Sequence, residues 1–288
     1  MGRFERGWAL LKSSWSVLKE EPKLLLFPCI TMVALTLVMA TFALPFVIDH
    51  DLFRSIADRQ PGGGHGRVLA YVLTFLFYLA TNFVIIFFNT ALIACVMMRF
   101  RGVRPTIGAG LGVAMGRLPQ IAAWAAVAAT VGMVLKLLEE RVPLLGRIAV
   151  RLVGMAWSIV TYFVTPVLVV EGVGPGRALK RSAELLRRTW GESLTGQATL
   201  GILGFLFSLP GIVLIVIGIS LGAGHHPPSV APMVIGIGLG VLWFIAIAII
   251  SSALQQIFVA GAYVYASEGR LPSGFEPEII QMAFRAKR

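Results

Sequence analysis

Residues 171–193 read EGVGPGRALKRSAELLRRTWGES, and their pattern indicates the kind of fold that the chain adopts. Apolar side chains recur at i, i+4, i+7 and i+11, the spacing of one helical face: Leu179, Ala183, Leu186 and Trp190. Five basic side chains and one acidic side chain fill the rest of the circumference: Arg177, Lys180, Arg181, Glu184, Arg187 and Arg188. Pro175, in a Gly-Pro-Gly loop, suits a first helical turn. An amphipathic helix with a basic face is predicted to lie at a membrane surface.

The composition predicts an integral membrane protein. Hydrophobic residues make up 57% of the 288 residues, charged residues only 14%, and the mean hydropathy is +0.83, far from the balance of a soluble domain. A chain this apolar leaves no room for a separate soluble catalytic domain of ordinary size, so we expect residues 1–288 to form a single transmembrane domain. Cys29 and Cys95 both lie in apolar runs, and we expect buried thiols there, with no disulfide.

Six apolar runs are long enough to cross a bilayer. They cover about residues 24–48, 68–98, 118–138, 147–170, 199–221 and 231–266. Amphipathic segments near Phe4, Ile107 and Leu179 each precede an odd-numbered span. The predicted fold class is therefore all-α: six transmembrane helices with cytoplasmic interfacial helices. The layout fits either three copies of a helical hairpin or the chance spacing of surface helices.

Glycines at intervals of four residues predict close helix packing, because small residues let two backbones approach. One such set lies in the segment between Pro105 and Pro119: Gly108, Gly112 and Gly116. A second set flanks the turn between spans five and six: Gly218, Gly222, Gly236 and Gly240. We expect the second set to join spans five and six, or else to meet a partner protein.

The distribution of basic residues predicts the orientation. With six spans, eighteen of the 25 Lys and Arg residues fall at the two termini and in the second and fourth loops. The positive-inside rule then places both termini in the cytoplasm. The net charge of +11 is explained by this topology and by anionic lipid, so we expect no nucleic-acid partner.

Parts of the chain resemble known membrane families. Pro166-Val-Leu-Val-Val-Glu171, followed by Ala178-Leu-Lys-Arg-Ser182, Leu185-Leu186 and Trp190, resembles bacterial six-span families related to the membrane domain of glycerophosphoryl diester phosphodiesterases. The opening Arg6-Gly-Trp-Ala-Leu-Leu-Lys-Ser-Ser-Trp15 is similar to a family of integral membrane proteins of unknown function. The resemblance covers most of the chain. It implies a six-span architecture in a bacterial inner membrane and supplies no chemistry, because the soluble phosphodiesterase domain has no counterpart here.

Polar residues within two of the apolar spans are candidates for function. The second span carries Tyr71, Tyr78, Asn82 and Asn89 on one face, and the last span carries Ser252, Gln256 and Tyr263. Asn89 and Gln256 lie at similar depth by helical rise, so we expect that they are able to meet. One reading is a polar pathway or small-ligand site, and the other is interhelical hydrogen bonding that holds the bundle together.

Several activities lack the residues that they need. No Asp or Glu lies in the central part of a predicted span, which argues against proton- or sodium-coupled transport. The four histidines, His50, His65, His225 and His226, fall in predicted outer loops without metal-binding spacing. No Ser, His and acid grouping converges on one side of the membrane. We therefore predict no enzyme activity, no metal and no cofactor.

The predicted function is that of a non-enzymatic membrane protein, a scaffold or accessory, that engages anionic lipid and also another membrane protein or a second copy of itself. The predicted lipid-headgroup contacts are Arg99, Arg101, Arg104, Arg177, Lys180, Arg181, Arg187 and Arg188. The alternative is an uncoupled transporter or channel for a small solute or lipid. It would use the intramembrane polar residues of spans two and six: Tyr78, Asn82, Asn89, Ser252 and Gln256.

Overall fold

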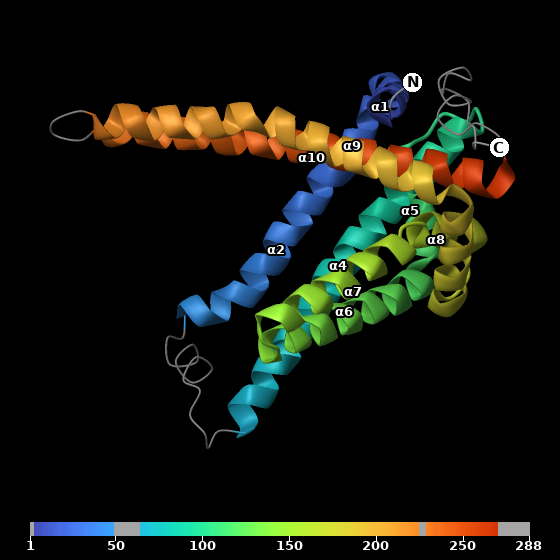
Figure 1. The fold of residues 1–288 in the computed structure, drawn as a ribbon, viewed down its shortest axis with the longest axis horizontal. Coiled ribbons are helices and arrows are strands. Elements are labelled where there is room, and N and C mark those ends of the chain that lie inside the picture. The colour runs from blue at the N-terminus through green and yellow to red at the C-terminus, as the bar shows by residue number, and fades with distance from the viewer. Residues whose placement is uncertain (1–2, 49–63, 225–228, 270–288) are drawn as a thin grey trace. The chain divides into compact units, whose positions relative to one another are not determined.

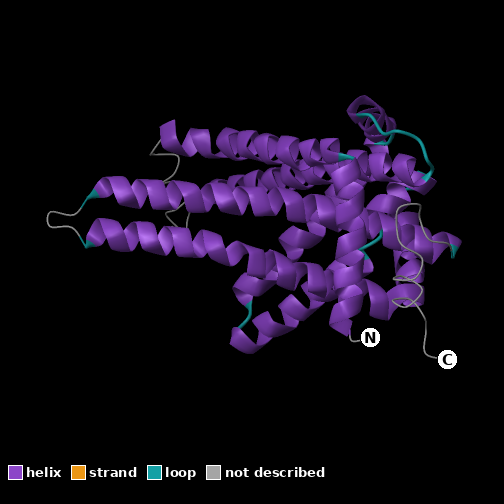
Figure 2. Ribbon diagram, turned by 90° about the horizontal axis from the view of Figure 1, so that it is seen from above, coloured by secondary structure: helices purple, strands orange, loops and turns teal. Residues whose placement is uncertain are grey.

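The computed structural model describes residues 3–48, 64–224 and 229–269, of which the side chains of 3–11, 45–48, 64–67 and 188–197 fall outside the description. The described residues form helices joined by short turns and contain no strand (Figure 2). The helices are α1 (Arg3–Glu20), η1 (Pro22–Leu25), α2 (Leu26–Ile48), α4 (Gly64–Phe100), α5 (Ile107–Gly116), α6 (Leu118–Arg141), α7 (Leu144–Val160), α8 (Val164–Glu171), α9 (Pro175–Ala223) and α10 (Val230–Glu268). The all-α prediction is confirmed.

Six stretches among the described residues are long and apolar enough to cross a membrane. They are Pro22–Leu44, Val68–Phe100, Leu118–Arg141, Leu144–Glu171, Ala198–Ala223 and Val230–Glu268, and each overlaps one predicted span. Large apolar side chains on α9 and α10 are exposed, Phe205 and Ile235 among them, as expected where a helix faces lipid. The prediction of six spans is confirmed by length and composition.

The contacts within the chain divide it into two compact units, and α9 contributes residues to both. The first unit consists of residues 1–25 and 189–288, and the second of residues 26–188. The single transmembrane domain stays a prediction.

The second unit is organised around α4, because α2, α5, α6 and α8 all pack against this helix. Its core contains apolar side chains with at most 1% of their surface exposed: Phe27, Leu92, Ile93, Ile121 and Leu168. Figure 1 shows α6 and α7 alongside each other, as their contacts require. Cys29 and Cys95 are free thiols. Cys95 is buried, as predicted, whereas Cys29 is only half-buried.

Close packing of α5 on α4 depends on Gly110. A Cβ at Gly110 would collide with the Cys95 sulfur and would lie 2.7 Å from the Ala91 carbonyl oxygen. A Cβ at the three glycines predicted for this role, Gly108, Gly112 and Gly116, would meet nothing within 4 Å. The predicted face was therefore wrong, because the helix turns its Gly110 and Ala114 side toward α4. The threefold hairpin duplication stays a prediction.

The fourth span is not one continuous helix. Helix α7 ends at Val160 and α8 begins at Val164, with Thr161, Tyr162 and Phe163 between them. Phe163 is fully buried, and its ring lies edge-on to that of Tyr162 at 4.8 Å. A continuous span was expected here. The sequence does not reveal the interruption, because residues 161–163 include no glycine and no proline.

In the first unit, α9 and α10 run side by side (Figure 1). A Cβ at Gly218 would lie 2.5 Å from the Cα of Gly236, and one at Gly240 would collide with the Ile215 side chain. The indole N–H of Trp243 in α10 donates a 2.8 Å hydrogen bond to the Phe207 carbonyl of α9, which adds a polar link between the two helices. The predicted packing of spans five and six is confirmed.

Candidate functional site

The basic start of α9 is anchored by the side opposite its cations. Ala178, Ser182, Leu185 and Leu186 have at most 3% of their surface exposed, whereas Leu179 and Ala183 are half-buried. The packed face is therefore rotated by about one residue from the predicted apolar stripe. Arg188 and Trp190 have side chains outside the described part.

Ser182 ties α9 to the break in the fourth span. Its hydroxyl donates a 2.6 Å hydrogen bond to the Val160 carbonyl and accepts a 3.0 Å hydrogen bond from the Phe163 N–H. These are two backbone groups that the interruption leaves without helical partners. Sequence reasoning missed Ser182. Its spacing of four residues after Ala178 and three before Leu185 could have placed it on the packed face.

Of the α9 cations predicted to contact lipid headgroups, one forms ion pairs and three form none among the described residues. The Arg181 guanidinium lies 3.0 Å from the Glu171 carboxylate and 3.6 Å from that of Glu184. The exposed side chains of Arg177, Lys180 and Arg187 have no ion-pair partner among the described residues. Three cations of this helix therefore carry charge toward the surroundings, while Arg181 also holds the α8–α9 corner.

The corner between α8 and α9 is closed by a glycine. Gly172 adopts a left-handed conformation with φ of 62° at the end of α8, and its carbonyl accepts a 3.4 Å hydrogen bond from the Gln120 side-chain amide. A Cβ at Gly172 would collide with the Arg117 guanidinium. A cation beside the last turn of a helix is electrostatically favourable. This contact brings the start of α6 to the start of α9.

The cations after α4 belong to the same end of the second unit. Arg101 and Arg104 are exposed, and Arg99 is half-buried and engaged with a neighbouring group. Helix α5 follows them and packs back on α4, so the end of α4 and the start of α6 lie at one end of the unit. The Arg117–Gly172 contact joins the start of α9 to that end. The structure thus brings the two predicted groups of cations to one end.

Two residues on the polar face of the second span have local partners. The Asn82 side-chain amide donates a 2.8 Å hydrogen bond to the Tyr78 carbonyl of its own helix. The Tyr78 ring packs on Gly132 of α6 and has the Lys136 ammonium 5.8 Å from its centroid. Asn89 is half-buried. Tyr78 thus takes part in the α4–α6 packing, whereas Asn82 bonds within α4.

The polar residues of the last span belong to the other unit. Ser252 and Gln256 are half-buried on α10. Because Asn89 lies in the second unit, its meeting with Gln256 stays a prediction. The described part of the chain contains no group of three or more His, Cys, Asp or Glu side chains able to hold a metal ion. His50, His225 and His226 lie outside that part, as does the side chain of His65.

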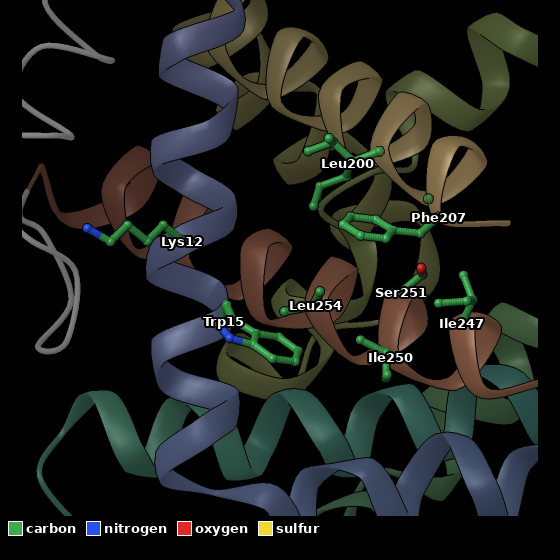
Figure 3. Close-up of a pocket in the computed structure, with 10 residues that line it drawn as sticks. Lys12, Trp15, Leu200, Phe207, Ile247, Ile250, Ser251 and Leu254 are labelled. Atoms are coloured by element: carbon green, nitrogen blue, oxygen red, sulfur yellow. The ribbon is translucent and has the colours of Figure 1, made fainter. Parts of the chain in front are cut away.

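The first unit contains a pocket of about 430 Å³ between α1, α9 and α10 (Figure 3). Its lining is mostly apolar and comes from three separate segments: Lys12, Trp15, Leu200, Leu203, Gly204, Phe207, Ile247, Ile250, Ser251 and Leu254. Trp15 points toward the pocket, whereas the Lys12 ammonium points away from the other lining side chains (Figure 3). Sequence reasoning missed this pocket, because no local pattern joins segments so far apart.

The comparison with known families gives one match. A family described as a family of unknown function (DUF6159) matches residues 68–275. The chain belongs to this family. No curated protein matches the chain. The resemblance to the membrane domain of glycerophosphoryl diester phosphodiesterases stays a prediction.

The DUF6159 match covers the second to sixth spans, and this protein is a multi-pass membrane protein. The matched region includes the anchoring Ser182 and the pocket residues of α9 and α10. Lys12 and Trp15, which complete the pocket, precede the matched region.

Proposed function

We propose that this DUF6159 protein is a non-enzymatic protein of a bacterial inner membrane that binds anionic lipid headgroups through the cations at one end of its second unit. The observation that carries the proposal is the helix face formed by Arg177, Lys180 and Arg187. These side chains are exposed, lack ion-pair partners among the described residues and lie opposite the packed face of α9. Their charge is therefore available to an external anion.

The membrane is the expected source of that anion. A basic residue near an anionic bilayer surface contributes about 1 kcal/mol of attraction, so three on one helical face outweigh thermal energy. The helix follows directly from a span that ends at Glu171, which keeps it at the depth of the bilayer surface. Arg101 and Arg104 extend the positive charge at the same end of the unit. The excess of basic residues on this side supports a cytoplasmic placement.

The experiment compares lipid retention by the intact protein and by a variant with Arg177→Gln and Arg187→Gln. Each protein is exchanged from detergent into mixed micelles of phosphatidylglycerol and phosphatidylethanolamine, and the lipids that remain bound are counted by native mass spectrometry. The variant is expected to retain fewer phosphatidylglycerol molecules than the intact protein. The matched control, Arg141→Gln with Arg147→Gln, removes two exposed cations that have no ion-pair partner among the described residues, at the other end of the same unit, and should retain as many as the intact protein. Equal retention by all three proteins would overturn the proposal.

A partner in the membrane is the second part of the proposed role. A scaffold or accessory protein needs another membrane protein or a second copy of itself, and the same mass spectra give the oligomeric state. Pull-down from mild detergent with the intact chain tests the hetero-association. A strictly monomeric protein that brings down nothing above the level of the control would remove this part and leave the lipid contact standing.

A flux assay distinguishes the alternative, an uncoupled transporter or channel, from the proposed scaffold or accessory role. Asn89 and Gln256 are two of the five polar residues that this alternative would use, and neither side chain has a hydrogen-bond partner among the described residues. Solute or lipid flux in proteoliposomes that disappears with Asn89→Leu and with Gln256→Leu would replace the scaffold proposal. Absence of flux above that of protein-free vesicles is the expected result.

A further inference from the structure

The pocket between α1, α9 and α10 exists because α9 and α10 approach closely only along part of their length. In the first unit, glycines bring their backbones together at Gly218 and Gly236, and a Cβ at Gly222 would collide with Met233. Toward the start of α9 the spacing widens. A Cβ at Gly204 would make an ordinary 3.5 Å contact with the Ser251 hydroxyl. The wider part of the helix pair is where the pocket lies.

Helix α1 covers this wider part. Val17 and Leu18 of α1 are buried, with 2% and 3% of their surface exposed, and α1 packs on α10. Trp15, on the neighbouring side of the helix, keeps 39% of its surface exposed and lines the pocket. Because α1 is amphipathic, it belongs at the bilayer surface, and indole rings settle at headgroup depth. The pocket therefore begins at the depth of the lipid headgroups.

From that depth the pocket extends along the spans. Leu200 and Phe207 both line it, and seven residues of helix correspond to about 10 Å. Both belong to the first turns of the span that begins at Ala198. The long axis of the pocket thus follows the direction in which a lipid chain lies in the bilayer.

The chemistry of the lining selects a hydrocarbon occupant. Its volume of about 430 Å³ falls within the range of roughly 300–1,000 Å³ typical of small-ligand sites. Leu203 and Ile250 are typical of the walls, and Ser251 supplies the one hydroxyl of the lining. A polar solute would lose most of its hydration there and gain few hydrogen bonds in return, which costs several kcal/mol. An apolar chain makes no hydrogen bonds to water, so its burial has no such cost.

The rim supplies positive charge. Lys12 is one of the lining residues, and its ammonium points away from the others (Figure 3). The Lys19 ammonium lies 5.7 Å from the centroid of the Trp15 ring. The ammonium groups of α1 thus stay outside the apolar space while their helix forms one of its walls. This arrangement complements an amphiphile with an anionic head and an apolar tail.

We propose that this pocket holds one acyl chain of an anionic phospholipid, whose phosphate lies beside Lys12 and Lys19. The site is separate from the basic face of α9, because its residues belong to the first unit and the basic face to the second. It goes beyond the proposed function by assigning a single lipid to a defined place. The aliphatic and aromatic walls hold the chain, and the cations of α1 select the head.

The test fills the pocket and counts bound lipid. Gly204→Leu and Ser251→Leu each place a bulky side chain inside the lining, and either suffices if the other fails to fold. Gly201→Leu is the matched control, because it is the same substitution one turn earlier on α9, at a position with open space. Each purified protein is equilibrated with phosphatidylglycerol in detergent, diluted, and examined by native mass spectrometry. Melting temperatures confirm that the variants are folded.

The intact protein and Gly201→Leu are expected to retain one phosphatidylglycerol through dilution, and both pocket variants to lose it. Lys12→Gln with Lys19→Gln should reduce the preference for phosphatidylglycerol over phosphatidylethanolamine. The Arg177→Gln, Arg187→Gln protein should keep the retained lipid, which separates this site from the basic face. Retention by folded pocket variants, or equal loss in Gly201→Leu, would overturn the proposal. Retention of a free fatty acid with no phospholipid would overturn the assignment of the head.

Discussion

The Ser182 hydroxyl of α9 donates a 2.6 Å hydrogen bond to the carbonyl of Val160, the last residue of α7. The same oxygen accepts from the Phe163 N–H at 3.0 Å, so one side chain satisfies both backbone groups at the break between α7 and α8. Ser182 has none of its surface exposed, so both hydrogen bonds are shielded from solvent. The basic helix is thereby held to the span that precedes it.

Removing this hydroxyl is expected to destabilise the protein. Ser182→Ala leaves a buried carbonyl and a buried N–H without partners, at a cost of about 1–3 kcal/mol. The measurements are the melting temperature in detergent and the hydrogen-exchange rate of the Phe163 amide. The control is Ser158→Ala, since the Ser158 hydroxyl bonds only to the Gly154 carbonyl of its own helix at an exposed position. Equal melting temperatures for both variants would contradict the assigned role.

Alanine substitutions at two glycines of α5 are expected to act in opposite directions. A Cβ at Gly110 collides with the Cys95 sulfur and approaches the Ala91 carbonyl, so Gly110→Ala should cost about 1–3 kcal/mol through overpacking. Gly112→Ala meets open space and should stabilise the helix by up to about 1 kcal/mol. Thermal unfolding of the two variants in one detergent measures the difference. Destabilisation by Gly112→Ala instead would restore the glycine face that the sequence predicts.

The corner at Gly172 offers a third comparison. Gly172→Ala places a Cβ at a positive φ and against the Arg117 guanidinium, and the left-handed conformation alone costs about 1–2 kcal/mol for a residue with a side chain. The matched variant Gly174→Ala has open space and ordinary backbone angles. We expect only Gly172→Ala to lower the melting temperature. It should also raise the proteolytic sensitivity of the α8–α9 connection, and an unchanged digestion pattern would argue against a structural corner.

The spans were predictable because a long apolar run can be recognised without knowing which helix it packs against. The break at residues 161–163 was not, since Tyr162 and Phe163 continue the apolar run. The hydroxyl that bonds to the Val160 carbonyl and the Phe163 N–H comes from Ser182, about twenty positions later. Gly110 was missed for a related reason. Two glycine faces of α5 have similar spacing, and only the position of α4 decides which one is packed.

The charged residues show the same limit. The sequence places Arg181 with Arg177 and Arg187 on one basic helix, but it does not reveal that Glu171 lies 3.0 Å from Arg181. That ion pair crosses the α8–α9 corner, whose path depends on Gly172. The sequence thus predicted that this end of the protein is basic. Only the structure distinguishes Arg181, which forms an ion pair, from Arg177 and Arg187, which form none among the described residues.

The orientation of the chain in the membrane can be tested by labelling two short connections, the one before α9 and the one before α10. With both termini in the cytoplasm, Ser229, at the start of α10, lies outside, and Gly174, just before α9, lies inside. In intact spheroplasts, a membrane-impermeant maleimide should therefore label Ser229→Cys, and it should label Gly174→Cys only after permeabilisation. Cys29 and Cys95 lie within or beside spans, and the unsubstituted protein measures their background. The reverse pattern would place the basic face of α9 outside, where the positive-inside rule disfavours it, and would remove the cytoplasmic leaflet as its lipid source.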